Sequence, residues 1–148
     1  VSNTFDIKKH IDDLNLKLEE DYLFFLDSTV ARFWFKNQKA KHQILDSLNE
    51  NNYGSWIDSN DKDIYRINYN HNRYGDAIWW ANDGILISPN FWQSNRVLKG
   101  MHGYRNESMD NHTAFITNKK KYVSSIGNII DMVEVNKILR NIVKMENI

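Results

Sequence analysis

Apolar residues recur at helical spacing in three stretches of the chain. In Phe5–Leu18 the apolar positions lie three or four residues apart, and Asp6 is placed to cap the first turn. The same spacing predicts a second helix over Gln38–Asn49 and a third over Ile129–Met145. These three stretches form the predicted helical part of the fold.

Short apolar runs between the helices predict strands. Tyr22–Leu26 is a continuous apolar run typical of a buried strand, and Val30–Phe35 is a second strand. The residues between them, Asp27-Ser28-Thr29, have the chemistry of a turn. Two shorter runs, Ile64–Ile67 and Thr113–Thr117, are also predicted as strands.

A hairpin is predicted in the middle of the chain. Ala77–Ala81 and Gly84–Ser88 flank Asn82-Asp83-Gly84, and an Asp-Gly pair between hydrophobic runs favours a tight turn. Pro89 would end the pairing. Asn90–Asp110 has no clear period and is predicted to be a long loop, which inside a compact domain is often functional. Together the elements predict an α/β layered fold with helices on a mixed sheet, or α+β if the chain is an isolated piece.

Length, charge and cysteine content narrow the class of protein. The 148 residues suffice for one domain, and no linker or repeat divides them, so a single unit over 1–148 is predicted. With 19 basic and 19 acidic residues the chain lacks the basic excess of a nucleic-acid binder. No apolar run approaches the ~18 residues that cross a membrane. We therefore predict neither a nucleic-acid polymer nor a membrane as a partner of this segment.

The absence of cysteine excludes disulfides and thiolate metal sites. The first residues, Val1-Ser2-Asn3-Thr4, show no signal peptide. Both features agree with a cytoplasmic and with an exported protein, so the compartment stays open.

His102 is the leading candidate for chemistry. It lies between Gly100 and Gly103, and flanking glycines allow a metal or an oxyanion to approach the imidazole closely. The alternative is a structural loop histidine whose glycines serve turn geometry. Catalytic zinc needs three protein ligands, and no His-x-x-x-His or Asp-x-x-x-His pair supplies the other two here.

The remaining candidates have structural interpretations. His112 precedes a predicted strand, His71 lies in a polar loop, and His10 and His42 lie on predicted helix surfaces. Nothing near Asp27-Ser28-Thr29 would activate a hydroxyl nucleophile, so a turn is preferred there.

Two further side chains are assigned by their sequence neighbourhood. Asp76 begins a strand, and an ion pair with Arg73 or Arg32 is expected for it. Trp92 lies in the loop before His102 and is predicted to border a pocket.

Several segments, taken in order, resemble the C-terminal part of a known enzyme family. Arg73–Ala81 contains a Gly-Asp-hydrophobic run, and Gly100–Asn106 contains a His-Gly-Tyr motif some 25 residues later. Both are similar to motifs of type I phosphodiesterases and nucleotide pyrophosphatases of the alkaline phosphatase superfamily. Phe25–Trp34, Thr113–Ile116 and Ile129–Val133 are similar to neighbouring segments of that family, so the resemblance covers roughly residues 22 to 145.

The resemblance implies a function and a role for each part of the chain. The family holds two zinc ions with Asp and His residues and uses a Thr or Ser nucleophile on small phosphate esters. His102 would be its last zinc ligand, and Trp92, Tyr104 and Arg105 are possible pocket-wall residues. Residues 22–70 would be a cap or insert, and residues 71–148 the end of the catalytic core.

The nucleophile and the other ligands would then lie in an N-terminal remainder of the same domain, so this chain alone would be inactive. Arg105 departs from the family, which typically has Asp at that position. The alternative to a hydrolase fragment is a small self-contained α+β binding or interaction module with a structural histidine loop.

Overall fold

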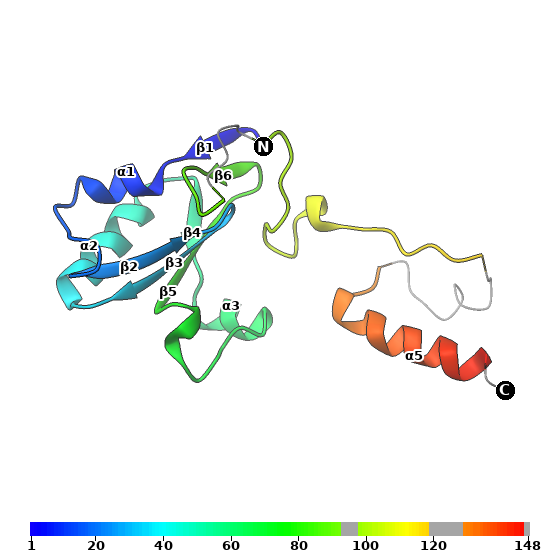
Figure 1. Ribbon diagram of the computed structural model, residues 1–148. Helices are drawn as coiled ribbons and strands as arrows, with labels where there is room; N and C mark the ends of the chain where they lie inside the picture. The colour runs from blue at the N-terminus through cyan, green and yellow to red at the C-terminus, as the bar shows by residue number, and fades with distance from the viewer. Residues whose placement is uncertain (93–97, 119–128, 147–148) are drawn as a thin grey trace. The chain divides into compact units, whose positions relative to one another are not determined.

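The computed structural model describes residues 1–92, 98–118 and 129–146, and every structural statement below refers to these residues (Figure 1). The chain divides into two compact units, residues 1–112 and residues 113–148. Each unit is described by itself.

The first unit is built around a four-stranded antiparallel sheet. Its strand order is β2 (Tyr22–Leu26), β3 (Val30–Phe35), β5 (Ala77–Ala81) and β4 (Gly54–Trp56) (Figure 1). In the register of these strands Phe25 lies opposite Arg32, which lies opposite Ile78. Residues in register point to the same face, so alternate residues of each strand divide between two faces.

A second, two-stranded sheet lies beside the first. β1 (Asn3–Phe5) pairs in parallel with β6 (Ile85–Ile87), and Thr4 lies opposite Leu86. This pairing joins the beginning of the chain to a strand more than 80 residues later.

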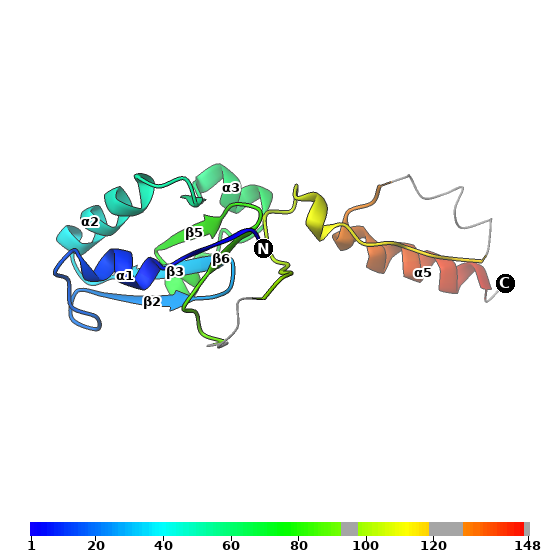
Figure 2. The ribbon, with the colours of Figure 1, turned by 90° about the horizontal axis from the view of Figure 1, so that it is seen from above.

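Helices α1 (Ile7–Asp12) and α2 (Gln38–Asn49) lie side by side and cover one face of the four-stranded sheet (Figure 2). Both begin at a side-chain cap: Asp6 accepts a hydrogen bond from the Lys9 amide at 2.8 Å, and Asn37 accepts one from the Ala40 amide at 2.9 Å. Their apolar residues pack onto the inward side chains of the strands. The core they form consists of Phe5, Ile7, Ile11, Tyr22, Leu26, Ala31, Phe33, Ala40, Ile44, Leu48, Trp79, Ala81 and Ile87.

The opposite face of the sheet is contacted by the segment that connects β4 to β5. This segment contains α3 (Ser59–Ile64) and the 3-10 helix η1 (Asn72–Tyr74). The Trp34 indole donates a hydrogen bond to the Asn72 carbonyl at 2.6 Å. The Arg32 guanidinium lies 4.4 Å from the centre of the Tyr74 ring. Cation–π and hydrogen-bond contacts therefore attach this polar segment to the sheet.

The second unit contains the 3-10 helix η3 (Met132–Glu134) and α5 (Val135–Glu146). Asp131 caps the start of η3 by accepting a hydrogen bond from the Val133 amide at 3.2 Å. Many apolar side chains of this unit are exposed: Phe115, Ile116, Ile129, Met132, Val133, Leu139 and Val143. No helix in the described part of the chain has the length and apolarity needed to cross a bilayer.

The predicted fold class is confirmed, because helices accompany one parallel and one antiparallel sheet. The bounds of α2 match the predicted helix Gln38–Asn49, and β2 and β3 match the predicted strands. Asp27-Ser28-Thr29 forms the turn between those strands, with the Asp27 amide donating to the Val30 carbonyl at 2.8 Å.

Two predictions on helix and strand bounds are wrong. The first helix ends at Asp12 instead of Leu18, because Asn15 adopts a left-handed backbone with φ of 54°. The predicted strand Ile64–Ile67 is instead the end of α3 and the turn after it, and Arg66 has φ of 57°. The signal missed was Asp58, which caps α3 by accepting a hydrogen bond from the Asp61 amide at 2.7 Å.

The predicted hairpin of β5 and β6 is also wrong. The turn forms, with Gly84 at φ of 80° and the Ile85 amide bonded to the Asn82 carbonyl at 3.0 Å. However, both edges of β5 are occupied by β3 and β4, so β6 pairs with β1 instead.

Three smaller expectations also fail. Thr113–Thr117 has no regular structure, and the last helix begins at Val135 after η3. Leu23 is exposed, so β2 is not buried on both faces.

Candidate functional site

His102 lies in the segment between β6 and the 3-10 helix η2 (Met109–Asn111), and its side chain is exposed. It lines a cavity of about 770 Å³ in the first unit. The turn Asp27-Ser28-Thr29 and the side chain of Trp92 form other parts of the same wall. Residue pairs that are 65 and 74 positions apart in the sequence therefore meet at one cavity.

The backbone next to His102 is held in place by one side chain of the turn between β2 and β3 and one side chain of β5. The Thr29 hydroxyl donates to the Gly103 carbonyl at 2.7 Å, and the Trp80 indole donates to the same oxygen at 2.9 Å. Thr29 is buried, with 4% of its surface exposed. Each such bond contributes roughly 0.5–1.5 kcal/mol, and two donors on one oxygen fix the orientation of that peptide.

The two glycines on either side of His102 differ in whether the structure requires a glycine at that position. Gly103 has φ of +91°, and a Cβ there would lie 3.1 Å from the Thr29 hydroxyl oxygen. Its glycine is therefore required by the fold of this chain. Gly100 has no atom of the described residues within 4 Å of where a Cβ would lie, and its φ is outside the left-handed region. The described residues therefore give no structural reason for a glycine at position 100.

Asp27 and Trp92 are joined across the cavity wall. The Trp92 indole donates to an Asp27 carboxylate oxygen at 2.9 Å, and the same oxygen accepts the Ser28 amide at 2.7 Å. Trp92 nevertheless remains 68% exposed. Its ring is thus available to a ligand in the cavity while its polar group is already bonded.

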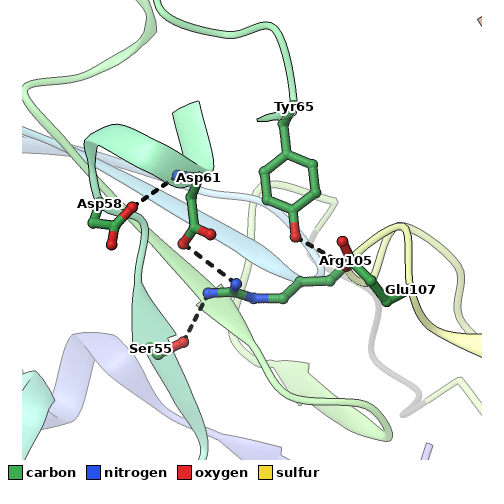
Figure 3. Close-up of polar contacts among 6 residues, drawn as sticks. All are labelled: Ser55, Asp58, Asp61, Tyr65, Arg105 and Glu107. Atoms are coloured by element: carbon green, nitrogen blue, oxygen red, sulfur yellow. Dashed lines mark hydrogen bonds and ion pairs between the residues drawn. The ribbon is translucent and has the colours of Figure 1, made fainter. Parts of the chain in front are cut away.

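Tyr104 and Arg105, the other proposed pocket-wall residues, point elsewhere. Tyr104 is buried, with 2% of its surface exposed. The Arg105 guanidinium reaches back to Asp61, at 3.3 Å, and donates to the Ser55 hydroxyl at 2.9 Å (Figure 3). Among the described residues neither Tyr104 nor Arg105 lines the cavity that His102 borders.

The other histidines occupy separate places. A ring nitrogen of His10 lies 3.0 Å from the Ser47 carbonyl oxygen, and His71 stacks on Tyr69 with ring centres 5.4 Å apart. His42 is exposed on α2, and His112 is exposed directly after η2.

Asp76 does not form the predicted ion pair. No ion pair joins it to Arg32 or Arg73 in the described part of the chain. Its carboxylate is exposed to solvent and accepts a hydrogen bond from the Phe35 amide at 2.9 Å. A carboxylate at the surface needs no cationic partner, and the backbone amide of the neighbouring strand satisfies one of its oxygens.

A metal site that included His102 would need further ligands near it. An exposed imidazole on a cavity wall is a suitable zinc ligand. No group of three His, Asp, Glu or Cys side chains that would hold a metal occurs in the described ranges. The described residues therefore do not fit a complete zinc shell.

The sequence singled out His102 and Trp92, which line the same cavity, but gave no indication of the contacts that position them. The hydroxyl of Thr29 and the indole of Trp80 carry no local signal that they bond Gly103. Comparisons of the chain with protein-family models, with curated proteins and with solved structures found no match.

Proposed function

We propose that this chain is part of a zinc-dependent hydrolase of phosphodiesters, nucleotide pyrophosphates or related phosphate esters, and that His102 supplies one metal ligand. The supporting observation is the exposed imidazole of His102 on the wall of a cavity large enough for a small ligand. The ordered motifs that resemble the type I phosphodiesterase family supply the reaction class.

The roles of this chain's own residues follow from their contacts. His102 offers a ring nitrogen to the shared site, and the bonds from Thr29 and Trp80 to Gly103 keep its backbone in place. The exposed ring of Trp92 borders the space for the substrate. Bound zinc would stabilise the attacking and leaving oxygens of an in-line displacement. By resemblance, the nucleophile and the other ligands lie outside residues 1–148.

The exposed apolar side chains of the second unit support the proposal that this chain shares its fold with a further segment of the longer protein. Ile116 is 88% exposed and Ile129 is 83% exposed, although apolar side chains of this size are usually buried. Large apolar side chains left exposed in this number are typical of a surface that another segment covers. The N-terminal remainder of the proposed hydrolase is a partner of this kind.

The proposal predicts that His102→Ala abolishes most activity of the longer protein. Loss of a metal ligand removes several kcal/mol of transition-state stabilisation, and each 1.36 kcal/mol is a factor of ten in rate. Hydrolysis of bis-p-nitrophenyl phosphate and of p-nitrophenyl nucleotide esters, with and without chelator, measures this. His112→Ala is the matched control and should retain nearly full turnover, because His112 is not in the cavity wall. Activity that resists chelator, or that survives in His102→Ala, refutes the proposal.

The second candidate function is a self-contained binding module, in which a partner molecule would cover the same exposed apolar side chains. The gene sequence upstream of Val1 discriminates between the two. Asp/Thr and Asp-His-Gly motifs in that upstream sequence favour the hydrolase, and a start codon close to Val1 favours the module.

A further inference from the structure

The loop that carries His102 is attached to α3 as well as to the sheet. The Arg105 guanidinium, three residues after His102, makes an ion pair with Asp61 of α3 at 3.3 Å. Its other terminal nitrogen donates to Ser55 of β4 at 2.9 Å (Figure 3). The side chains of Arg105 and Asp61 are only 30% and 22% exposed. A partly buried, two-partner guanidinium is held more firmly than an exposed ion pair.

A second bond joins the same two elements. The Tyr65 hydroxyl, at the C-terminal cap of α3, donates to Glu107 at 2.9 Å. The Tyr65 ring also packs edge-on against Trp80, with ring centres 5.1 Å apart. We call Asp61, Tyr65, Arg105 and Glu107 the α3 latch (Figure 3).

Each end of the latch is itself fixed. Asp58 caps α3 by accepting a hydrogen bond from the amide of Asp61, which sets the position of that residue. On the loop, the Asn111 side chain donates to the carbonyls of Tyr104 and Arg105, at 2.8 and 2.6 Å. The latch therefore connects two locally ordered segments, and little freedom remains between them.

We infer that the Asp61–Arg105 pair is a positioning pair for His102, an inference that rests on the proposed function. The loop is fastened at Gly103 by Thr29 and Trp80, and beyond that point by the α3 latch. The Gly103 bonds hold the peptide that follows Gly103 at one oxygen, and Asn111 holds the carbonyls of Tyr104 and Arg105. The α3 latch ties this loop to α3 and so restricts its movement relative to the sheet. Arg105 thus affects the proposed metal site only by positioning His102. Its positive charge is paired with Asp61 and does not face the cavity.

The test uses the ring signals of the histidines in this chain, observed by proton–carbon NMR without metal. Arg105→Gln and Asp61→Asn should shift and broaden the His102 ring signals. The swapped double variant Asp61→Arg/Arg105→Asp should restore them in part, because the pair is re-formed with reversed charges. Asp63→Asn is the matched control, since Asp63 also lies on α3 and, among the described residues, its side chain accepts a hydrogen bond from Asn68 and makes none with the loop that carries His102. It should leave His102 unchanged.

The ring signals of His10, which lies against the Ser47 carbonyl, report whether each variant is folded. Asp61→Asn keeps the size of the side chain, so it can replace Arg105→Gln as the test variant if Arg105→Gln does not fold. In the longer protein, breaking the pair should weaken zinc binding by about 10–100-fold, as for other groups that orient a metal ligand. Unchanged His102 signals in folded Arg105→Gln and Asp61→Asn overturn the inference. If these signals shift but His102→Ala does not affect zinc binding or turnover, the proposed function fails and the latch stands.

Discussion

Replacing Gly103 by alanine tests whether the backbone of the histidine loop is constrained by the fold. Gly103 has φ of +91°, where a Cβ costs about 1–2 kcal/mol for an L-residue. The new Cβ would also lie 3.1 Å from the Thr29 hydroxyl oxygen. Displacing that hydroxyl weakens a hydrogen bond of roughly 1 kcal/mol. Alanine restricts the unfolded chain and returns about 0.4–1 kcal/mol.

The net result expected for Gly103→Ala is a loss of roughly 1–2 kcal/mol in the free energy of unfolding. Urea denaturation followed by tryptophan fluorescence measures it. The tryptophans are Trp34, Trp56, Trp79, Trp80 and Trp92, so the signal reports the first unit. With a slope of about 2 kcal/mol per M urea, the midpoint should fall by about 0.5–1 M.

Gly100→Ala is the matched control, because its Cβ meets no described atom and its φ is not left-handed. It should leave the midpoint unchanged or raise it slightly. In a Thr29→Ala background, Gly103→Ala should lower the free energy of unfolding only by the cost of placing an alanine in the left-handed backbone conformation. Equal urea midpoints for Gly103→Ala and Gly100→Ala would refute the reasoning.

Two further predictions concern the stability of the first unit at Gly54 and at Tyr65. Gly54→Ala should destabilise the first unit by about 1–3 kcal/mol or more, because the added Cβ would fall on the Trp80 carbonyl oxygen and the buried Trp79 ring. Urea denaturation measures this, with Gly100→Ala as the control. An unchanged urea midpoint for Gly54→Ala would contradict the prediction. Burial, and then the hydrogen bond to Glu107, raises the pKa of Tyr65 above its usual value of 10.0. The stability that comes from neutral Tyr65 should therefore be complete below pH 10 and disappear as the pH rises through the raised pKa. Urea denaturation between pH 8 and about pH 11 should show that Tyr65→Phe loses less of its free energy of unfolding at alkaline pH than the unsubstituted protein does. Identical pH profiles for these two proteins would show that Tyr65 is not responsible for the loss.

Elements whose signals are local were predictable from the sequence. α2 was predicted from apolar residues at helical spacing, and the structure adds the Asn37 cap at its start; both signals act within a few residues of chain. β2 and β3 follow in the same way from two apolar runs around a turn. His102 and Trp92 were identified because a glycine-flanked histidine and an aromatic in a long loop are visible without tertiary structure.

Partners that are distant in the sequence were decided only by the tertiary structure. The hairpin of β5 and β6 failed because the choice of partner strand depends on which edges are already occupied. The bonds that hold the histidine loop span 74 residues from Thr29 to Gly103 and 44 from Asp61 to Arg105. A hydroxyl or a guanidinium carries no sign of its distant acceptor, because that acceptor exists only once the sheet and α3 have packed. The sequence by itself therefore determined which imidazole is the candidate ligand, whereas packing decided which side chains hold it in place.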